Sequence, residues 1–290
     1  MPDSGSVSPE LLATILILIS AILHAVVNAI VKISDDGLLT RGCMNAVALI
    51  VSAPFTLIVP FPTPETWQIL IIATLVHGLY PFFLAGAYRY GDLSAVLPLA
   101  RGITPLGVAL LAGFAVNEPL SAAKIASIAL ISLAVASFAF ERGALSSASR
   151  RRGMILAVIT GLIIAVYTTI DGVGLRVAET KMTYIVWLFV MDGVFVSSSV
   201  ALARRSALVP FLRRHWKPAL TGGVFGIMTY GLALYALGLG TIAEIAALRE
   251  TSTVFAVLIG TFFLGEHFGA RRIVAAFLVA TGAIALQVVH

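Results

Sequence analysis

The chain is a succession of long apolar runs separated by short polar breaks. An α-helix needs about 20 apolar residues to cross the roughly 30 Å hydrocarbon core of a membrane, and the runs have this length. Turn-forming residues lie between them, as in Pro60–Pro64 and Asn117–Pro119. The pattern predicts ten membrane-spanning helices, at residues 11–32, 40–60, 66–89, 93–115, 121–140, 153–175, 182–203, 217–238, 241–264 and 271–289.

The composition agrees with a protein whose solvent is lipid. Of the 290 residues, 59% are hydrophobic and 11% are charged, and the mean hydropathy is +1.02. A soluble domain carries roughly 25% charged residues, so this chain has too few to coat a water-exposed surface. A membrane β-barrel would show segments of about ten residues with alternating polarity, which are absent from the sequence. The predicted fold class is therefore an all-α polytopic membrane protein.

The two halves of the chain repeat one chemical pattern at an offset of 148 residues. Arg101–Thr104 and Asn117–Lys124 correspond to Arg249–Ser252 and Gly265–Arg272. Each half thus has an arginine within a span, then a loop glutamate and a cation six residues later. Five helices per half is an odd number, so the second half must enter the membrane from the opposite side. We predict two inverted five-helix repeats (5+5), residues 1–145 and 146–290, joined by the polar link Glu141–Gly153.

The distribution of basic residues predicts the orientation. Apart from Arg101 and Arg249, 14 of the Lys and Arg residues lie in loops on one side, and Lys124, Arg176 and Lys181 lie on the other. The positive-inside rule places the first group in the cytoplasm and both termini outside, in a multi-pass inner (plasma) membrane protein. We therefore attribute the net charge of +5 to topology signals and expect no nucleic-acid partner. The single cysteine, Cys43, excludes an intrachain disulfide.

Three pieces of sequence resemble the EamA domain of the drug/metabolite transporter superfamily. They are the first span with Leu23–Lys32, the stretch Tyr88–Leu99 that continues to Pro105, and the Glu-containing loops at Glu118 and Glu266. The resemblance covers nearly the whole chain. It implies a transporter in which the first, third, fourth, sixth, eighth and ninth spans surround a central cavity. Members of this family commonly have cytoplasmic termini, whereas the charge distribution here favours the opposite orientation.

Within that superfamily, the sixth span is similar to that of the aromatic amino-acid exporters. The similarity lies in Leu156–Ile159 and Ala165–Thr168. Thr104 and Ile164 stand where the resemblance implies cavity tryptophans. This difference favours smaller or more varied amino acids as substrates.

Ionisable side chains inside a membrane are costly and usually face a cavity or a partner. A zwitterionic amino acid needs a cation for its carboxylate and an acceptor for its ammonium group. We expect Arg101 or Arg249 to supply the cation, and Asp171 or Glu250 the acceptor. The predicted substrate-binding residues are His24, Asn28, His77, Tyr80, Arg101, Thr104, Tyr167, Asp171, Arg249 and Glu250, with Tyr88 and Tyr235 as further lining residues.

Several of these residues also have a structural interpretation. The arginines could pair with acids to hold helices together, and His24 and His77 could bridge helices by hydrogen bonds. Glu118 and Glu266 are expected to be structural, since both lie in loops and recur as part of the repeat. Asp192 lies near the middle of its span, and the sequence indicates no partner for it.

The preferred functional interpretation is a secondary transporter that exports amino acids or similar small metabolites by alternating access, acting as a monomer without a cofactor or metal. No Gly-x-x-x-x-Gly-Lys-Ser/Thr motif supports ATP-driven pumping. Transport could follow the substrate gradient or be coupled to protons. The first alternative is a multidrug or lipophilic-cation exporter of the same fold. The second is an intramembrane enzyme, which we disfavour because the chain has no His-Glu-x-x-His or Gly-x-Ser-x-Gly motif.

Overall fold

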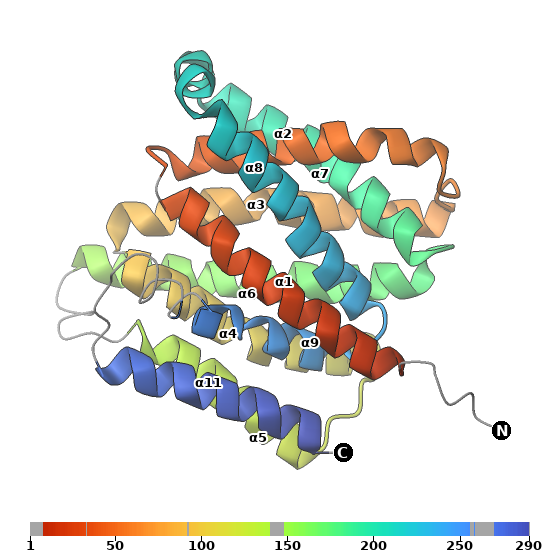
Figure 1. The fold of residues 1–290 in the computed structure, drawn as a ribbon, viewed down its shortest axis with the longest axis vertical. Helices are drawn as coiled ribbons and strands as arrows, with labels where there is room; N and C mark the ends of the chain where they lie inside the picture. The colour runs from red at the N-terminus through yellow and green to blue at the C-terminus, as the bar shows by residue number, and fades with distance from the viewer. Residues whose placement is uncertain are drawn as a thin grey trace.

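The computed structural model is a bundle of helices (Figure 1). It describes residues 8–32, 34–91, 93–139, 148–255, 258 and 270–289, and every regular element in these ranges is helical. The elements are α1 (Pro9–Lys32), α2 (Gly37–Ser52), a 3₁₀ turn η1 (Ala53–Leu57), α3 (Pro64–Tyr90), α4 (Leu93–Ala115), α5 (Ala122–Ser137), α6 (Ala148–Val177), α7 (Lys181–Ala203), α8 (Arg205–Leu237), α9 (Ile242–Arg249) and α11 (Ala270–Val288).

The predicted all-helical membrane architecture is confirmed. Within the described ranges, seven helical segments are long and apolar enough to cross a membrane: α1, α2 continued by η1, α3, α4, α6, α7 and α8. The apolar parts of α5 and α11 are shorter. Part of the predicted span 241–264 lies outside the described ranges. The loop residues Gly265, Glu266 and His267 also lie outside them.

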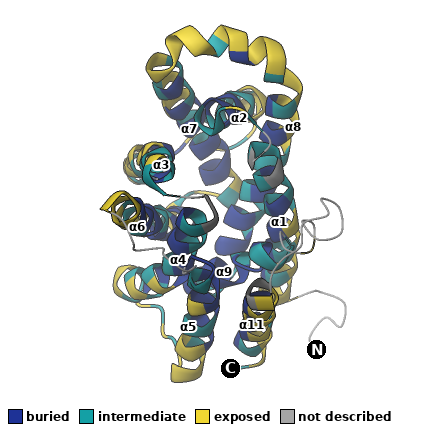
Figure 2. Cartoon of the chain, turned by 90° about the vertical axis from the view of Figure 1, so that its left-hand side faces the viewer, coloured by how far each residue is buried: buried dark blue, intermediate teal, exposed yellow. Residues whose placement is uncertain are grey.

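Helices of the two halves are interleaved. Figure 2 views the bundle along the helices. α3 and α6 lie on one side, and α1 and α8 lie on the other. α4 and α9 lie in the middle, above α5 and α11. α3 packs on α6 and α7, just as α8 packs on α1 and α2. α2 packs on α7, and α5 packs on α11. This exchange of partners is the one that a two-fold repeat requires, while the inverted relation of the halves stays a prediction.

The basic ends of several helices lie at the same end of the bundle. In Figure 1, the C-terminal end of α3, with Arg89, and the N-terminal end of α6 lie at the left, and α8 begins at the top left. The beginning of α1 and the end of α11 lie at the opposite end. The observed helix directions therefore agree with the grouping of charges that the sequence predicted.

Two boundaries predicted from hydropathy are wrong. The three arginines Arg150–Arg152 belong to the first turns of α6 and not to a polar link. The eighth helix begins at Arg205 instead of residue 217 and bends at His215, whose φ and ψ are −120° and 17°. Its first turns are basic but still amphipathic, because Phe211 is buried against α2 and α7. A prediction based only on the mean hydropathy of a sequence window misses such a helix.

Glycine allows α6 to approach α4 very closely. A Cβ atom at Gly161 would lie 2.4 Å from the carbonyl oxygen of Ala100, which is backbone and cannot swing away. A Cβ atom at Gly113 in α4 would have no neighbour within 4 Å. The two positions therefore form a matched pair for the same substitution.

We expect Gly161→Ala to lower the free energy of unfolding by about 1–3 kcal/mol, because the helices must move apart. Gly113→Ala should raise it by up to about 1 kcal/mol, since alanine has the higher helix propensity. Thermal unfolding of the purified proteins in detergent, followed by tryptophan fluorescence, measures both. Equal effects of the two substitutions would contradict this description of the α4–α6 contact.

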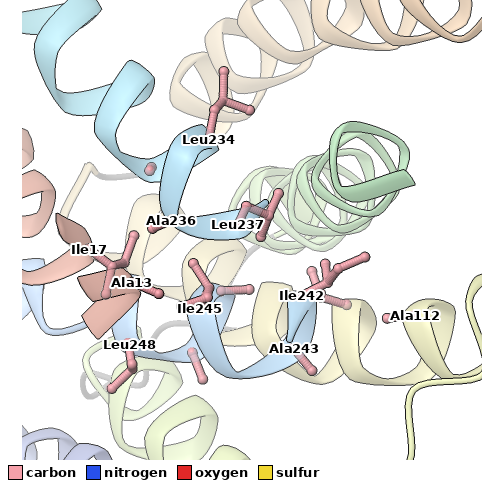
Figure 3. Close-up of a cluster of buried hydrophobic side chains, with 14 of the residues drawn as sticks. Ala13, Ile17, Ala112, Leu234, Ala236, Leu237, Ile242, Ala243, Ile245 and Leu248 are labelled. Atoms are coloured by element: carbon pink, nitrogen blue, oxygen red, sulfur yellow. The ribbon is translucent and has the colours of Figure 1, made fainter. Parts of the chain in front are cut away.

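Most residues of the short helix α9 are buried. Its side chains Ile242, Ile245 and Leu248 pack among residues from α1, α4 and α8, as Figure 3 shows. Its N-terminus is held by Glu118, whose carboxylate accepts hydrogen bonds from the backbone N–H groups of Ile242 (2.7 Å) and Ala243 (3.3 Å). An acidic side chain at a helix N-terminus also interacts favourably with the helix dipole. The predicted structural role of Glu118 is therefore confirmed, and α9 carries Arg249 at a fixed position.

Candidate functional site

A cluster of polar side chains lies buried between α3, α6, α7 and α8. At its centre is His77, whose Nε2 lies 3.2 Å from Asp171 Oδ2 and whose Nδ1 is hydrogen bonded to Asp192 Oδ2. Asp171 is fully buried, and His77 and Asp192 are less than a tenth exposed. Tyr184 donates to Asp171 Oδ1 (2.9 Å), and Tyr230 donates to Asp171 Oδ2 (2.6 Å). Buried polar groups are stable only when paired in this way.

Aromatic rings border this cluster on one side. The ring of Tyr167 meets that of His77 edge-on, with 4.3 Å between centroids, and the ring of Tyr80 lies 6.3 Å from that of Tyr167. The guanidinium carbon of Arg41 lies 5.3 Å from the Tyr80 ring centroid. The three tyrosines Tyr80, Tyr167 and Tyr230 are half-buried. A solute next to the cluster would therefore meet both aromatic faces and hydroxyl groups.

A second cluster joins α1, α4 and the residues that follow α9. Arg101 Nε and a terminal nitrogen donate to the two oxygens of Glu250, at 2.9 and 3.2 Å. The same guanidinium contacts His24 Nε2 and donates to Ser252 Oγ (3.1 Å). This two-point geometry is the strongest form of an arginine–carboxylate pair. Arg101 is thus neutralised within the protein.

Arg249 lies between the two clusters and has no such partner among the described residues. Its guanidinium carbon lies 4.9 Å from the ring centroid of Tyr230, a cation–π arrangement. Within the part of the chain that the structure describes, Arg249 makes no ion pair or hydrogen bond, and its buried Nε lacks an acceptor. The residue as a whole is half-buried. An anionic group would complete its coordination.

The repeat explains why, among the described residues, Arg101 has a carboxylate partner and Arg249 has none. Arg101 and Arg249 occupy equivalent positions in the two halves, and the next residue is Gly102 in one and Glu250 in the other. Gly102 is required by close packing, because a Cβ atom there would lie 2.6 Å from the backbone nitrogen of Ala136. The two arginines therefore share a single glutamate, and Arg101 holds it.

The structure brings most of the predicted site residues into two connected clusters. His77, Asp171 and Tyr167 meet in one cluster, while His24, Arg101 and Glu250 meet in the other. Asp171 and Glu250, predicted as open acceptors, are already paired with protein donors. The remaining predicted residues lie nearby on the same helices: Asn28 and Tyr80 are half-buried, and Thr104 is buried and donates to the backbone oxygens of Ala100 (3.0 Å) and Gly161 (3.3 Å).

Tyr88 and Tyr235, proposed as further lining residues, pack against hydrophobic clusters of the core. Sequence reasoning missed Tyr184, Tyr230 and Ser252 and left Asp192 without a partner. The aspartate carried a signal, since a carboxylate at mid-span needs a partner. Tyr184 and Tyr230 gave no such signal in the sequence, because tyrosine is also common at membrane interfaces. Their roles depend on which helices pack together.

Comparison with known proteins agrees with the fold. Residues 151–287 match the EamA-like transporter family. The matched segment is the second half of the chain, from the first turns of α6 into α11. A crystal structure described only as that of a protein has a similar fold, with a TM-score of 0.71 over 95% of this chain and 96% of the other, at 16% identity. No curated protein matches the sequence.

The family match covers just under half of the chain, residues 151–287. It agrees with the resemblance found in the sequence at the level of the superfamily. The aromatic amino-acid exporter subtype has no support beyond the residues of the sixth span. The substrate must therefore be argued from the side chains of the EamA-like half and their partners.

Proposed function

We propose that the chain is a secondary transporter that exports amino acids or similar small zwitterionic metabolites by alternating access. The observation that carries this proposal is Arg249, a half-buried arginine without an anionic partner among the described residues. A guanidinium group binds a carboxylate through two parallel hydrogen bonds. The two halves, residues 1–145 and 146–290, would be the repeats whose exchange of conformation opens the site to either side.

The surroundings of Arg249 complete the proposed substrate site. Tyr230 connects Arg249, which lies over its ring, to Asp171, which accepts its hydroxyl hydrogen. A substrate carboxylate at Arg249 would therefore place an ammonium group towards Asp171. Tyr80 and Tyr167 would border the substrate side chain, with His24, Asn28 and Thr104 on the neighbouring helices α1 and α4. Arg101 and Glu250 would hold these helices in position.

The multidrug alternative requires a different balance of charge. A lipophilic cation would suit Asp171 and the tyrosine rings, but an unneutralised arginine beside them repels it. Arg249 therefore favours a substrate that carries a negative group as well as a positive one.

The test is flux through the purified protein in liposomes. Each of the twenty L-amino acids, radiolabelled, is offered singly, and uptake is compared with that of protein-free liposomes. We expect saturable flux of a small set of amino acids, inhibited by the same unlabelled compound. Background flux for all twenty, together with saturable flux of the lipophilic cation tetraphenylphosphonium, would favour the multidrug alternative instead.

A further inference from the structure

The hydrogen-bond geometry of His77 requires an additional proton. Each of its ring nitrogens contacts a carboxylate oxygen, from Asp171 on one side and Asp192 on the other. A neutral imidazole donates from only one nitrogen, and an ionised carboxylate only accepts. Both contacts are hydrogen bonds only if the three groups together hold one proton more than a neutral histidine and two carboxylates. His77, Asp171 and Asp192 therefore share two protons, and the loss of one leaves a neutral histidine and two carboxylates.

The additional proton determines the net charge of the cluster, because the groups that face His77 are mostly acidic or neutral. α6 contributes Asp171 and Tyr167, α7 contributes Asp192 and Tyr184, and α8 contributes Tyr230. α2 and α4 also pack on α3, but they direct Arg41 to the ring of Tyr80 and Arg101 to Glu250. With the extra proton the cluster carries one negative charge, and without it two.

A second buried negative charge is unfavourable unless a cation replaces the proton. An amino-acid substrate brings such a cation in its ammonium group. Asp171 lies next to the proposed carboxylate site because both contact Tyr230. The Tyr230 hydroxyl donates to Asp171, and the Arg249 guanidinium lies over the Tyr230 ring. The imidazolium and the ammonium group are therefore alternative cationic partners for one carboxylate.

We propose that His77, Asp171 and Asp192 form the coupling site of a proton–substrate antiporter. This inference rests on the proposed function and adds its driving ion. When the ammonium group hydrogen bonds to Asp171, the N–H bond at His77 Nε2 breaks, its electron pair stays on nitrogen, and the proton leaves to water on that side. On the opposite side a proton binds His77 again and the substrate departs.

The cycle moves one proton inward for each amino acid exported. The cluster keeps one negative charge in both forms, since the ammonium group replaces the proton. The zwitterionic substrate has no net charge, so the exchange of one substrate for one proton moves one net positive charge per cycle. Both a pH gradient and a membrane potential should therefore drive it.

The experiment uses the native protein in liposomes that contain the pH-sensitive dye pyranine. Each of the twenty L-amino acids is added singly, and internal pH is recorded in parallel with radiolabelled flux. We expect every amino acid with saturable flux to move protons in the opposite direction, at a ratio near one. Saturable flux without proton movement would overturn the antiport inference and leave the proposed function standing. Absence of saturable flux for all twenty would overturn both.

Two histidine variants then locate the proton. His77→Asn should abolish amino-acid-driven proton movement, while counterflow of labelled amino acid is reduced but still measurable. His215→Asn is the matched control, because His215 pairs with the exposed Asp35 on the surface and should leave proton movement as in the native protein. Proton movement that persists in His77→Asn would overturn the assignment. If that variant does not fold, the native measurement still decides the antiport.

Discussion

Replacement of Arg249 by glutamine is expected to raise the amino-acid concentration for half-maximal flux about 100-fold. Two charge-assisted hydrogen bonds to a carboxylate contribute about 3 kcal/mol together, and every 1.4 kcal/mol is a factor of about ten. Arg249→Lys keeps the charge but not the two-point geometry, so its effect should be about tenfold. The measurement is concentration-dependent uptake into liposomes.

Stability provides a second, independent readout for the same variant. Since Arg249 has no ion-pair partner among the described residues, Arg249→Gln should leave the unfolding temperature unchanged or raise it. Arg213→Gln, at an exposed position on the first turns of α8, controls for the loss of a positive charge. Native flux in Arg249→Gln would contradict the proposed carboxylate site. A lower unfolding temperature with normal affinity would show a structural role instead.

Glu250→Gln is expected to lower the free energy of unfolding by about 3 kcal/mol, because it leaves Arg101 charged and unpaired in a largely buried position. The side chains of the pair are 13% and 4% exposed, so water replaces the lost carboxylate poorly. Thermal unfolding in detergent measures the loss. This expectation follows from the structure and replaces the idea that Glu250 is an open acceptor for substrate.

A double-variant cycle separates the pair from other effects of the substitution. Arg101→Gln combined with Glu250→Gln should recover at least half of the loss, because no buried charge is then left uncompensated. Asp35→Asn is the surface control: its carboxylate pairs with His215 but is 71% exposed, and exposed pairs contribute little. An effect of Glu250→Gln no larger than that of Asp35→Asn would contradict a structural role for the pair.

The sequence alone was sufficient for the membrane architecture and for the set of charged residues within spans. Both follow from the cost of exposing polar groups to hydrocarbon, which acts on each segment separately. The same reasoning could not assign partners. Arg101 meets Glu250 from a position 149 residues earlier, and before folding Asp171 or Asp192 was an equally reasonable partner.

For the same reason, the sequence could not show that Asp171 and Glu250 already have partners within the protein. A free carboxylate and a saturated one look identical in sequence, and the difference at Asp171 comes from Tyr184, Tyr230 and His77 on three other helices. The asymmetry between Arg101 and Arg249 was present in the repeat, where Gly102 stands opposite Glu250. The consequence is that, among the described residues, only Arg101 has a carboxylate partner, and this could be seen only from the packing of α4 against α5.

The contact of α1 with α8 constrains the order of events during synthesis. Ser20 and Thr229 each donate from the hydroxyl group to the other's backbone oxygen at 2.6 Å, although 209 residues separate them. A ribosome adding about 5–20 residues per second needs roughly 10–40 s to bridge that separation. During this time α1 must wait in the bilayer without its final neighbour. The first half is therefore an assembly intermediate rather than a finished unit, and a nascent chain stalled before α8 should be a preferred target of membrane quality control.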